Sequence, residues 1–179
     1  MKLLLVSSLW LVSLQAVFAQ EKPQVEVFGG YSYAAIAPNN FADRLNTNGG
    51  HTNVTINGSF MGFTADFSAH KAKSSITNAT TYNFMIGPRF SRSGEKVSWF
   101  VHSLYGVSTA RTDVPLISLK QSRTGFAYVP GGGGVDVKLN NRIAIRLFQF
   151  DLLFLKRTYP TPSISPRIST GIVIRWGGK

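Results

Sequence analysis

Apolar and polar side chains alternate one by one through eight stretches of the chain between Val25 and Trp176. In the last stretch, one parity carries Ile168, Ile172 and Trp176, whereas the other includes arginine, serine and glycine. Successive side chains of a β-strand point to opposite faces, so this alternation predicts strands with one apolar and one polar face. A membrane barrel and a water-soluble barrel both fit this pattern, and they differ in which face points inward.

The N-terminus indicates the compartment. Lys2 precedes an apolar stretch that ends at Ala19, with small residues at both recognition positions of a signal peptidase. Serines and a glutamine interrupt this stretch, which argues against the alternative of an uncleaved membrane anchor. We therefore predict a signal peptide over residues 1–19, removed after Ala19, and one outer-membrane β-barrel domain over residues 20–179.

Length and composition restrict how such a domain can be built. Residues 20–179 provide enough chain for eight strands of about 9 to 11 residues each, with their turns and no second domain. No later run of the sequence approaches the roughly 20 apolar residues of a membrane helix, so membrane insertion would have to use strands. The absence of cysteine from the whole sequence excludes a disulfide scaffold.

The chain is strongly basic, with a formal charge of +11 at pH 7. Nucleic acid is a common partner of basic proteins, but a secreted chain does not normally meet it. We expect no nucleic-acid partner and instead predict contact with the phosphates of outer-membrane lipid and lipopolysaccharide. The alternative is that these are ordinary solvated loop charges. The residues concerned are expected in or beside the long connections: Lys71, Lys73, Arg111, Lys120, Arg123, Lys156 and Arg157.

The connections are alternately long and short. The first, third, fifth and seventh are long and polar, as in barrels with external loops and short periplasmic turns, so both termini are expected in the periplasm. The predicted strands are Val25–Tyr33, Thr52–Asn57, Ser59–His70, Tyr82–Phe90, Val97–Thr109, a sixth ending at Lys138, a seventh from Ile143, and Arg167–Trp176.

Two short connections predict specific registers. Asn57-Gly58 is typical of a two-residue hairpin, which would pair Ile56 with Ser59. After the sixth strand, parity requires a three-residue turn that sets Asp136 opposite Arg146.

In the seventh strand the parity slips, because Gln149 and Asp151 fall on the apolar side. A bulge near Leu147 to Gln149 would return both polar groups to the interior, and the sequence leaves this open.

The polar parity is predicted to face the lumen. The reverse assignment would place several arginines against hydrocarbon, at about 2–4 kcal/mol each near the midplane. Glu26 and Arg175 lie near the same end of the first and last strands, so we expect them to pair where the barrel closes. Eight strands leave an interior that side chains can fill, and a wide pore is not expected. The predicted lumen charge network is Glu26, Asp66, Arg89, His102, Asp136, Arg146, Asp151, Arg167 and Arg175.

The sequence predicts no catalytic, cofactor or metal site. His102 and Ser103 are adjacent and project to opposite faces, so they cannot form a dyad. His51 and His70 are expected at the outer rim as solvent-exposed residues, and the three histidines lack metal-ligand spacing. The glycines at 131–134 precede a strand rather than a helix, so they indicate a tightly curved wall and not a phosphate cradle.

Six segments together resemble the outer-membrane β-barrel domain of the OmpA-type (OmpA/OmpX-like) superfamily. They are Val25–Tyr33, Thr64–Ser68, Gly87–Phe90, Gly132–Val137, Arg142–Arg146 and Ser169–Val173.

This resemblance spans essentially all of residues 20–179 and implies an all-β, eight-stranded antiparallel up-and-down transmembrane β-barrel in the outer membrane of a Gram-negative cell envelope. It also implies that Gly171, Ile174 and Trp176 belong to the C-terminal signal read by the barrel-assembly machinery, with Ile174 where an aromatic residue is usual.

The function expected from these observations is that of a non-enzymatic, integral outer-membrane barrel with a side-chain-filled lumen. Its role would be structural, with surface interaction through four external loops whose ligand is unknown. Two alternatives remain open: a narrow, porin-like ion or water pore, and a soluble secreted ligand-binding barrel. In the second alternative the cavity would be lined by Tyr31, Phe63, Phe84 and Trp99.

Overall fold

The computed structural model describes residues 24–36, 45–59, 61–73, 78–114, 119–156 and 163–177. The predicted signal peptide and its boundary with the barrel domain lie outside the described residues. Within the described residues, no helix is long and apolar enough to cross a membrane. The strands are β1 (Gln24–Ile36), β2 (Leu45–Asn57), β3 (Met61–Lys73), β4 (Asn78–Ser93), β5 (Val97–Val114), β6 (Leu119–Lys138), β7 (Ile143–Lys156) and β8 (Ser163–Trp176).

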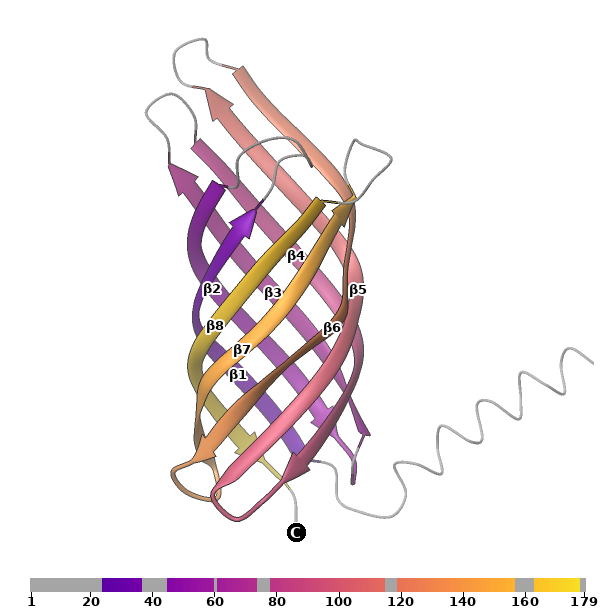
Figure 1. Cartoon of the computed structure of the whole chain (residues 1–179), viewed down its shortest axis with the longest axis vertical. Coiled ribbons are helices and arrows are strands. Elements are labelled where there is room, and N and C mark those ends of the chain that lie inside the picture. The colour runs from indigo at the N-terminus through magenta and orange to yellow at the C-terminus, as the bar shows by residue number, and fades with distance from the viewer. Residues whose placement is uncertain are drawn as a thin grey trace, which may run out of the picture.

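The eight strands form one closed antiparallel barrel (Figure 1). Each strand pairs with the next in chain order, and β1 pairs with β8. Closure leaves no strand edge unpaired, so the backbone donors and acceptors of the wall find partners within the sheet. The predicted fold class is confirmed.

The two ends of the barrel differ. Val25 pairs with Trp176, so β1 begins and β8 ends at one end, here called the terminal end. The short turns after β2, β4 and β6 lie at this end. The other end, here called the loop end, carries the links of residues 37–44, 74–77, 115–118 and 157–162, which fall outside the described residues.

The strands run farther toward the loop end than predicted. β2 begins at Leu45 rather than Thr52, and β5 continues to Val114 rather than ending near Thr109. The residues in these extensions are mostly polar, so they do not show the alternation that predicts a strand. Pairing with the neighbouring strand nevertheless satisfies their backbone hydrogen-bonding groups as well as it does in the apolar part of the wall. Six of the seven basic residues expected in or beside the connections are therefore strand residues: Lys71, Lys73, Arg111, Lys120, Arg123 and Lys156. Arg157 lies outside the described residues.

The predicted orientation of the faces is confirmed. Ile168, Ile172 and Trp176 are 49%, 55% and 50% exposed on the outside, whereas Arg146 and Arg167 are fully buried inside.

The soluble-carrier alternative is wrong in its central expectation. The four aromatic residues assigned to its cavity lie outside the barrel, about half exposed: Tyr31, Phe63, Phe84 and Trp99.

The two register predictions have different outcomes. Asp136 pairs with Arg146 across the turn between β6 and β7, as predicted. The two-residue hairpin is wrong, because Ile56 pairs with Phe63 rather than Ser59, and Gly58 N donates to the carbonyl of Met61 at 2.9 Å.

Two β-bulges correct the parity of the wall. In β7, Leu147 and Phe148 both face outward, and this extra residue brings Gln149 and Asp151 inside. This is the bulge that the sequence suggested and left open. A second irregularity in β6, which the alternation pattern does not predict, makes Pro130 and Gly131 both face outward.

Candidate functional site

The half of the lumen near the terminal end holds a cluster of ion pairs. Arg175 Nε donates to Glu26 Oε1 at 2.9 Å, which is the seam pair expected between the first and last strands. Asp136 joins this pair to Arg146, accepting from Arg175 Nη2 at 3.2 Å and from Arg146 Nε at 2.7 Å. Arg89 Nη2 lies 2.9 Å from Glu26 Oε2. Five of the nine predicted lumen residues are thus brought together.

The other four lie farther along the lumen, around Arg167. Arg167 Nη1 donates to Asp66 Oδ1 at 3.0 Å, and Arg167 Nη2 donates to Asp151 Oδ2 at 2.7 Å. Asp151 Oδ1 also lies 2.7 Å from His102 Nε2. All four side chains are buried, so the guanidinium of Arg167 shares its charge between two carboxylates without water.

Gln149 connects the two clusters. Its amide oxygen accepts from Arg146 Nη1 at 2.7 Å, and its amide nitrogen donates to Asp151 Oδ2 at 2.9 Å. The β7 bulge is what turns Gln149 and Asp151 inward in this sequence, so the continuous network depends on the bulge. In the sequence, Gln149 only interrupts the alternation, and this signal does not indicate its role as a link.

The network is electrically balanced. It contains four carboxylates and four guanidinium groups, all at most 5% exposed. Burial of an unpaired charge is costly, and a pair must also satisfy its remaining hydrogen-bonding groups. A neutral lumen therefore leaves the chain's net positive charge to residues outside the network.

Two aromatic rings inside the barrel complete the packing of the arginines. The guanidinium carbon of Arg146 lies 4.4 Å from the ring centre of Phe28 and 4.3 Å from that of Phe100. Arg89 lies 3.9 Å from the same Phe100 ring. Such contacts offset part of the desolvation of a buried guanidinium. Both rings share the polar parity of their strands, and this signal could have added them to the predicted site.

Two of the four consecutive glycines make room for this network. A Cβ at Gly132 would lie 2.1 Å from Asp151 Oδ1 and 2.6 Å from His102 Nε2. A Cβ at Gly134 would lie 2.8 Å from the ring of Phe100. This agrees with the expectation of a wall where bulk is excluded, and the space goes to inward-pointing side chains.

His51 and His70 are not at a solvent-exposed rim, as predicted, but are buried to 3% and 1% exposure. The ring nitrogens of His51 lie 2.5 Å from Asp66 Oδ2 and 3.0 Å from Ser169 Oγ. His70 Nε2 lies 2.9 Å from Ser32 Oγ, which also accepts from Ser169. The rim position was wrong because the strands extend past these residues and carry them inside.

Ser169, His51 and Asp66 form the order of groups that nucleophilic catalysis uses. Ser169 is only 1% exposed and its hydroxyl is engaged by His51 and Ser32. A substrate therefore has no approach to this serine in the closed barrel. The described residues contain no group of three or more potential ligands that could hold a metal ion.

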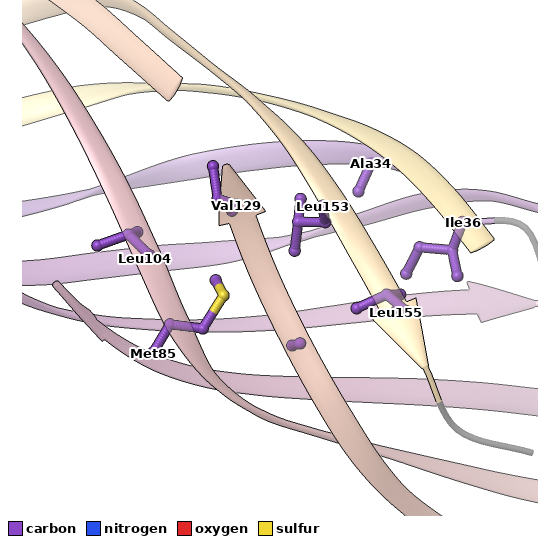
Figure 2. Close-up of a cluster of buried hydrophobic side chains, with 8 residues drawn as sticks. Ala34, Ile36, Met85, Leu104, Val129, Leu153 and Leu155 are labelled. Carbon is purple, nitrogen blue, oxygen red and sulfur yellow. The ribbon is translucent and has the colours of Figure 1, made fainter. Parts of the chain in front are cut away.

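Toward the loop end, part of the lumen is apolar (Figure 2). Leu153 and Leu155 of β7 point inward near Ile36 of β1, at the loop-end portions of these strands. The full apolar lumen cluster is Ala34, Ile36, Met85, Leu104, Ala127, Val129, Leu153 and Leu155. The lumen thus contains a charged region and an apolar region, which meet where Ala34 pairs with Arg167.

The outer wall is apolar between the two ends. Large hydrophobic side chains cover it with exposed fractions of 36% to 65%, from Leu152 to Phe126. A water-soluble protein buries such residues and exposes its charges, whereas this barrel does the reverse. The wall is therefore suited to hydrocarbon as its solvent.

Basic residues lie outside the wall near the loop end. Lys71 of β3 pairs with Thr80 of β4, which pairs in turn with Arg111 of β5, so the two exposed cations belong to one row across the sheet. Arg111 also lies 5.7 Å from the ring centre of Tyr82. Lys156, exposed on β7, pairs with Phe126. Cations beside aromatic rings at this height are typical of a headgroup region.

Two solved structures share this architecture. Neisserial surface protein A is 11% identical, with a TM-score of 0.69, and the match covers 86% of this chain and 97% of that protein. Ail, the attachment invasion locus protein of Yersinia pestis, is 17% identical, with a TM-score of 0.56, and the match covers 87% of this chain and 99% of that protein. The chain therefore shares its fold with these two proteins.

A second structure of Ail holds the heparin analogue sucrose octasulfate and is 16% identical, with a TM-score of 0.52, covering 87% of this chain and 99% of its own. No protein-family model and no curated protein sequence matches the chain. Identities this low establish the fold alone.

Proposed function

We propose that the chain is an integral outer-membrane barrel that stabilises the cell envelope and meets surface partners at its loop end, without enzymatic activity. The observation that carries this proposal is the inverted distribution of side chains, with charges inside and apolar residues outside. The apolar wall fits a bilayer, and the fold is shared with outer-membrane proteins.

The unequal ends support an orientation in the membrane. The short turns, the start of β1 and the end of β8 lie at one end, which fits the periplasm, and the loop end would then face the exterior. The basic row formed by Lys71 and Arg111 would lie at the outer headgroups, where it meets lipopolysaccharide phosphates. Ail, of the same fold, accommodates a polysulfated ligand, which is consistent with anion recognition by such a barrel.

Fractionation and gel migration test the proposal together. The full chain, expressed in a Gram-negative host, should sediment with the outer membrane and migrate faster without boiling than after boiling. Protease added to intact cells should cut only at the loop end. Recovery of the mature chain as a soluble periplasmic protein without a heat-dependent shift would overturn the proposal.

A further inference from the structure

A hollow of about 570 Å³ lies in the outer wall where β4, β5, β6 and β7 pass side by side. Apolar side chains and bare backbone form most of its lining, in particular Pro88, Phe90, Val101, Pro130, Gly131 and Phe150. Phe90, Val101 and Phe150 are 42%, 47% and 42% exposed and belong to the apolar outer wall. The hollow is therefore continuous with the lipid-facing surface.

The hollow has a local cause in the sequence. Ser103 of β5 lies opposite Pro88 of β4 and Pro130 of β6. It has no paired residue on either neighbouring strand, although the residues before and after it on β5 pair with β6. Proline has no N–H to offer a ladder, and the β6 bulge places Pro130 and Gly131 outward together. The Ser103 hydroxyl donates to the carbonyl of Val129 at 3.2 Å, so it is already engaged. Water would find few partners here, and hydrocarbon fits better.

A row of aromatic side chains crosses β5, β6 and β7 on the loop-end side of the hollow. Tyr105 pairs with Tyr128, which pairs in turn with Phe154. The rings of Tyr105 and Tyr128 stack at 6.5 Å between centres, and those of Tyr128 and Phe154 at 4.9 Å. Lys156 follows Phe154 on the outward face of β7. An aromatic row followed by a cation is the arrangement expected where a membrane meets its headgroups.

The depth of the hollow matches an outer-leaflet lipid. Phe150 and Lys156 are separated along β7 by about 20 Å, at roughly 3.3 Å per residue. With a strand tilt of about 40°, this corresponds to about 15 Å of depth, half of a hydrocarbon core roughly 30 Å thick. A chain anchored at the level of Lys156 would thus reach the hollow with its tail.

We propose that this hollow seats one acyl chain of lipid A, the acylated phosphoglycolipid of lipopolysaccharide, with its phosphates beside Lys156. This inference rests on the proposed function, which places the loop end on the outside of the cell. It adds a binding site for the lipid tail, whereas the basic row of Lys71 and Arg111 accounts only for the headgroup.

Native mass spectrometry of the folded full-length barrel, titrated with purified lipid A, tests the proposal. Gly131→Leu fills the hollow, since a Cβ at Gly131 meets no atom within 4 Å. Gly29→Leu is the matched control, because Gly29 is equally open and lies on β1, away from the hollow. Lipid A occupancy should fall at least several-fold in Gly131→Leu and stay unchanged in Gly29→Leu. Gly131→Ala should give an intermediate loss, and it serves if the leucine variant folds poorly.

Several results would overturn the acyl seat. Wild-type occupancy in folded Gly131→Leu or Gly131→Ala would do so, as would equal losses in the Gly29 control. Loss of bound phosphatidylethanolamine rather than lipid A would assign the hollow to another lipid, and loss of dimers would assign it to a second copy of the chain. Failure of the proposed function appears separately, as absence of the heat-dependent gel shift in the unmutated protein.

Discussion

Arg167 is the residue on which the loop-side half of the charge network depends. It bridges Asp66 and Asp151, and each of these carboxylates is fully buried. Removing one partner of a buried ion pair leaves an uncompensated charge, which costs about 3–5 kcal/mol. Asp66, Asp151 and Arg167 are all fully buried, so bulk solvent does not reach the two carboxylates to replace the guanidinium.

We therefore predict that Arg167→Met lowers the free energy of unfolding by about 3–5 kcal/mol. Reversible urea unfolding in lipid vesicles measures this, with Lys71→Met as an exposed control that should change stability by less than about 0.5 kcal/mol. Adding Asp151→Asn to Arg167→Met should recover part of the loss. Equal stability of the Arg167 and Lys71 variants would contradict the structural role of the network.

Side-chain parity was enough to find eight of the nine predicted lumen residues, because a wrong face would put charge in hydrocarbon, whereas Asp151 also needed the hypothesis of a bulge. Parity also places Phe28 and Phe100 inside the barrel, but it does not show what their rings contact. Only the structure shows that both rings pack against Arg146. His51 was misplaced because the length of β2 could not be predicted from a segment rich in asparagine and glycine.

Among the elements, the hairpins show which registers a sequence can determine. The turn after β6 was predicted correctly because an even-numbered turn would have paired inward with outward residues. After β2, the predicted and observed registers both pair inward with inward residues, so parity does not distinguish them. The prediction therefore depended on the Asn57-Gly58 signal alone, and this signal gave the wrong register. A two-residue turn would have set Phe60 opposite Thr55 on the inward face, whereas the observed register joins Thr55 to Thr64 at 2.8 Å.

The two bulges differ in the same way. Gln149 and Asp151 are polar residues on an apolar parity, and this conflict made the β7 bulge visible in advance. Pro130 and Gly131 have no such preference for one face, so the β6 bulge does not disturb the alternation of apolar and polar residues. Proline and glycine together were the available signal, since both are typical of irregular strand positions.

Deleting Leu147 tests the β7 bulge. The deletion would remove the extra residue and leave strict alternation from Arg146 through Phe148 to Gln149 and Asp151, so both polar groups should stay inside. We expect the barrel to keep its fast-migrating unboiled form. Deleting Phe150 leaves the bulge in place but turns Asp151 toward lipid and Phe154 inside, so this variant should lose that form. Loss of the form in the Leu147 deletion as well would contradict the assignment of Leu147 as the extra residue.

The C-terminal strand carries the predicted assembly signal of Gly171, Ile174 and Trp176, which stays a prediction. Trp176→Ala should slow insertion by the barrel-assembly machinery several-fold, because the machinery would read this residue, whereas Trp99→Ala removes a similarly exposed tryptophan elsewhere. Appearance of the heat-modifiable form in vesicles containing the machinery gives the rate. Equal rates for the two variants would contradict a special role for Trp176, and Ile174→Phe should accelerate insertion.

In the whole molecule, apolar side chains cover the outer wall and charged side chains lie in the lumen. The wall fits hydrocarbon, and the charged groups of the lumen pair with one another. Closing the barrel completes both the apolar outer surface and the ion pairs inside. The lumen is also filled by two kinds of side chain, since the ion pairs extend from the terminal end as far as Arg167 and the apolar lumen cluster lies beside Arg167 and toward the loop end. Ions following the axis would have to cross both.

This arrangement predicts that the wild-type barrel does not conduct. In planar bilayers containing the purified protein, we expect no steady single-channel current. Arg146→Ala should also stay silent, because removing one guanidinium leaves the apolar lumen cluster in place. Opening both regions, by combining Arg146→Ala with Leu104→Ser and Leu155→Ser, should produce measurable current if the barrel still shows its heat-dependent gel shift. Steady current through the wild-type protein, enlarged by Arg146→Ala alone, would instead support the narrow-pore alternative and assign gating to the ion pairs.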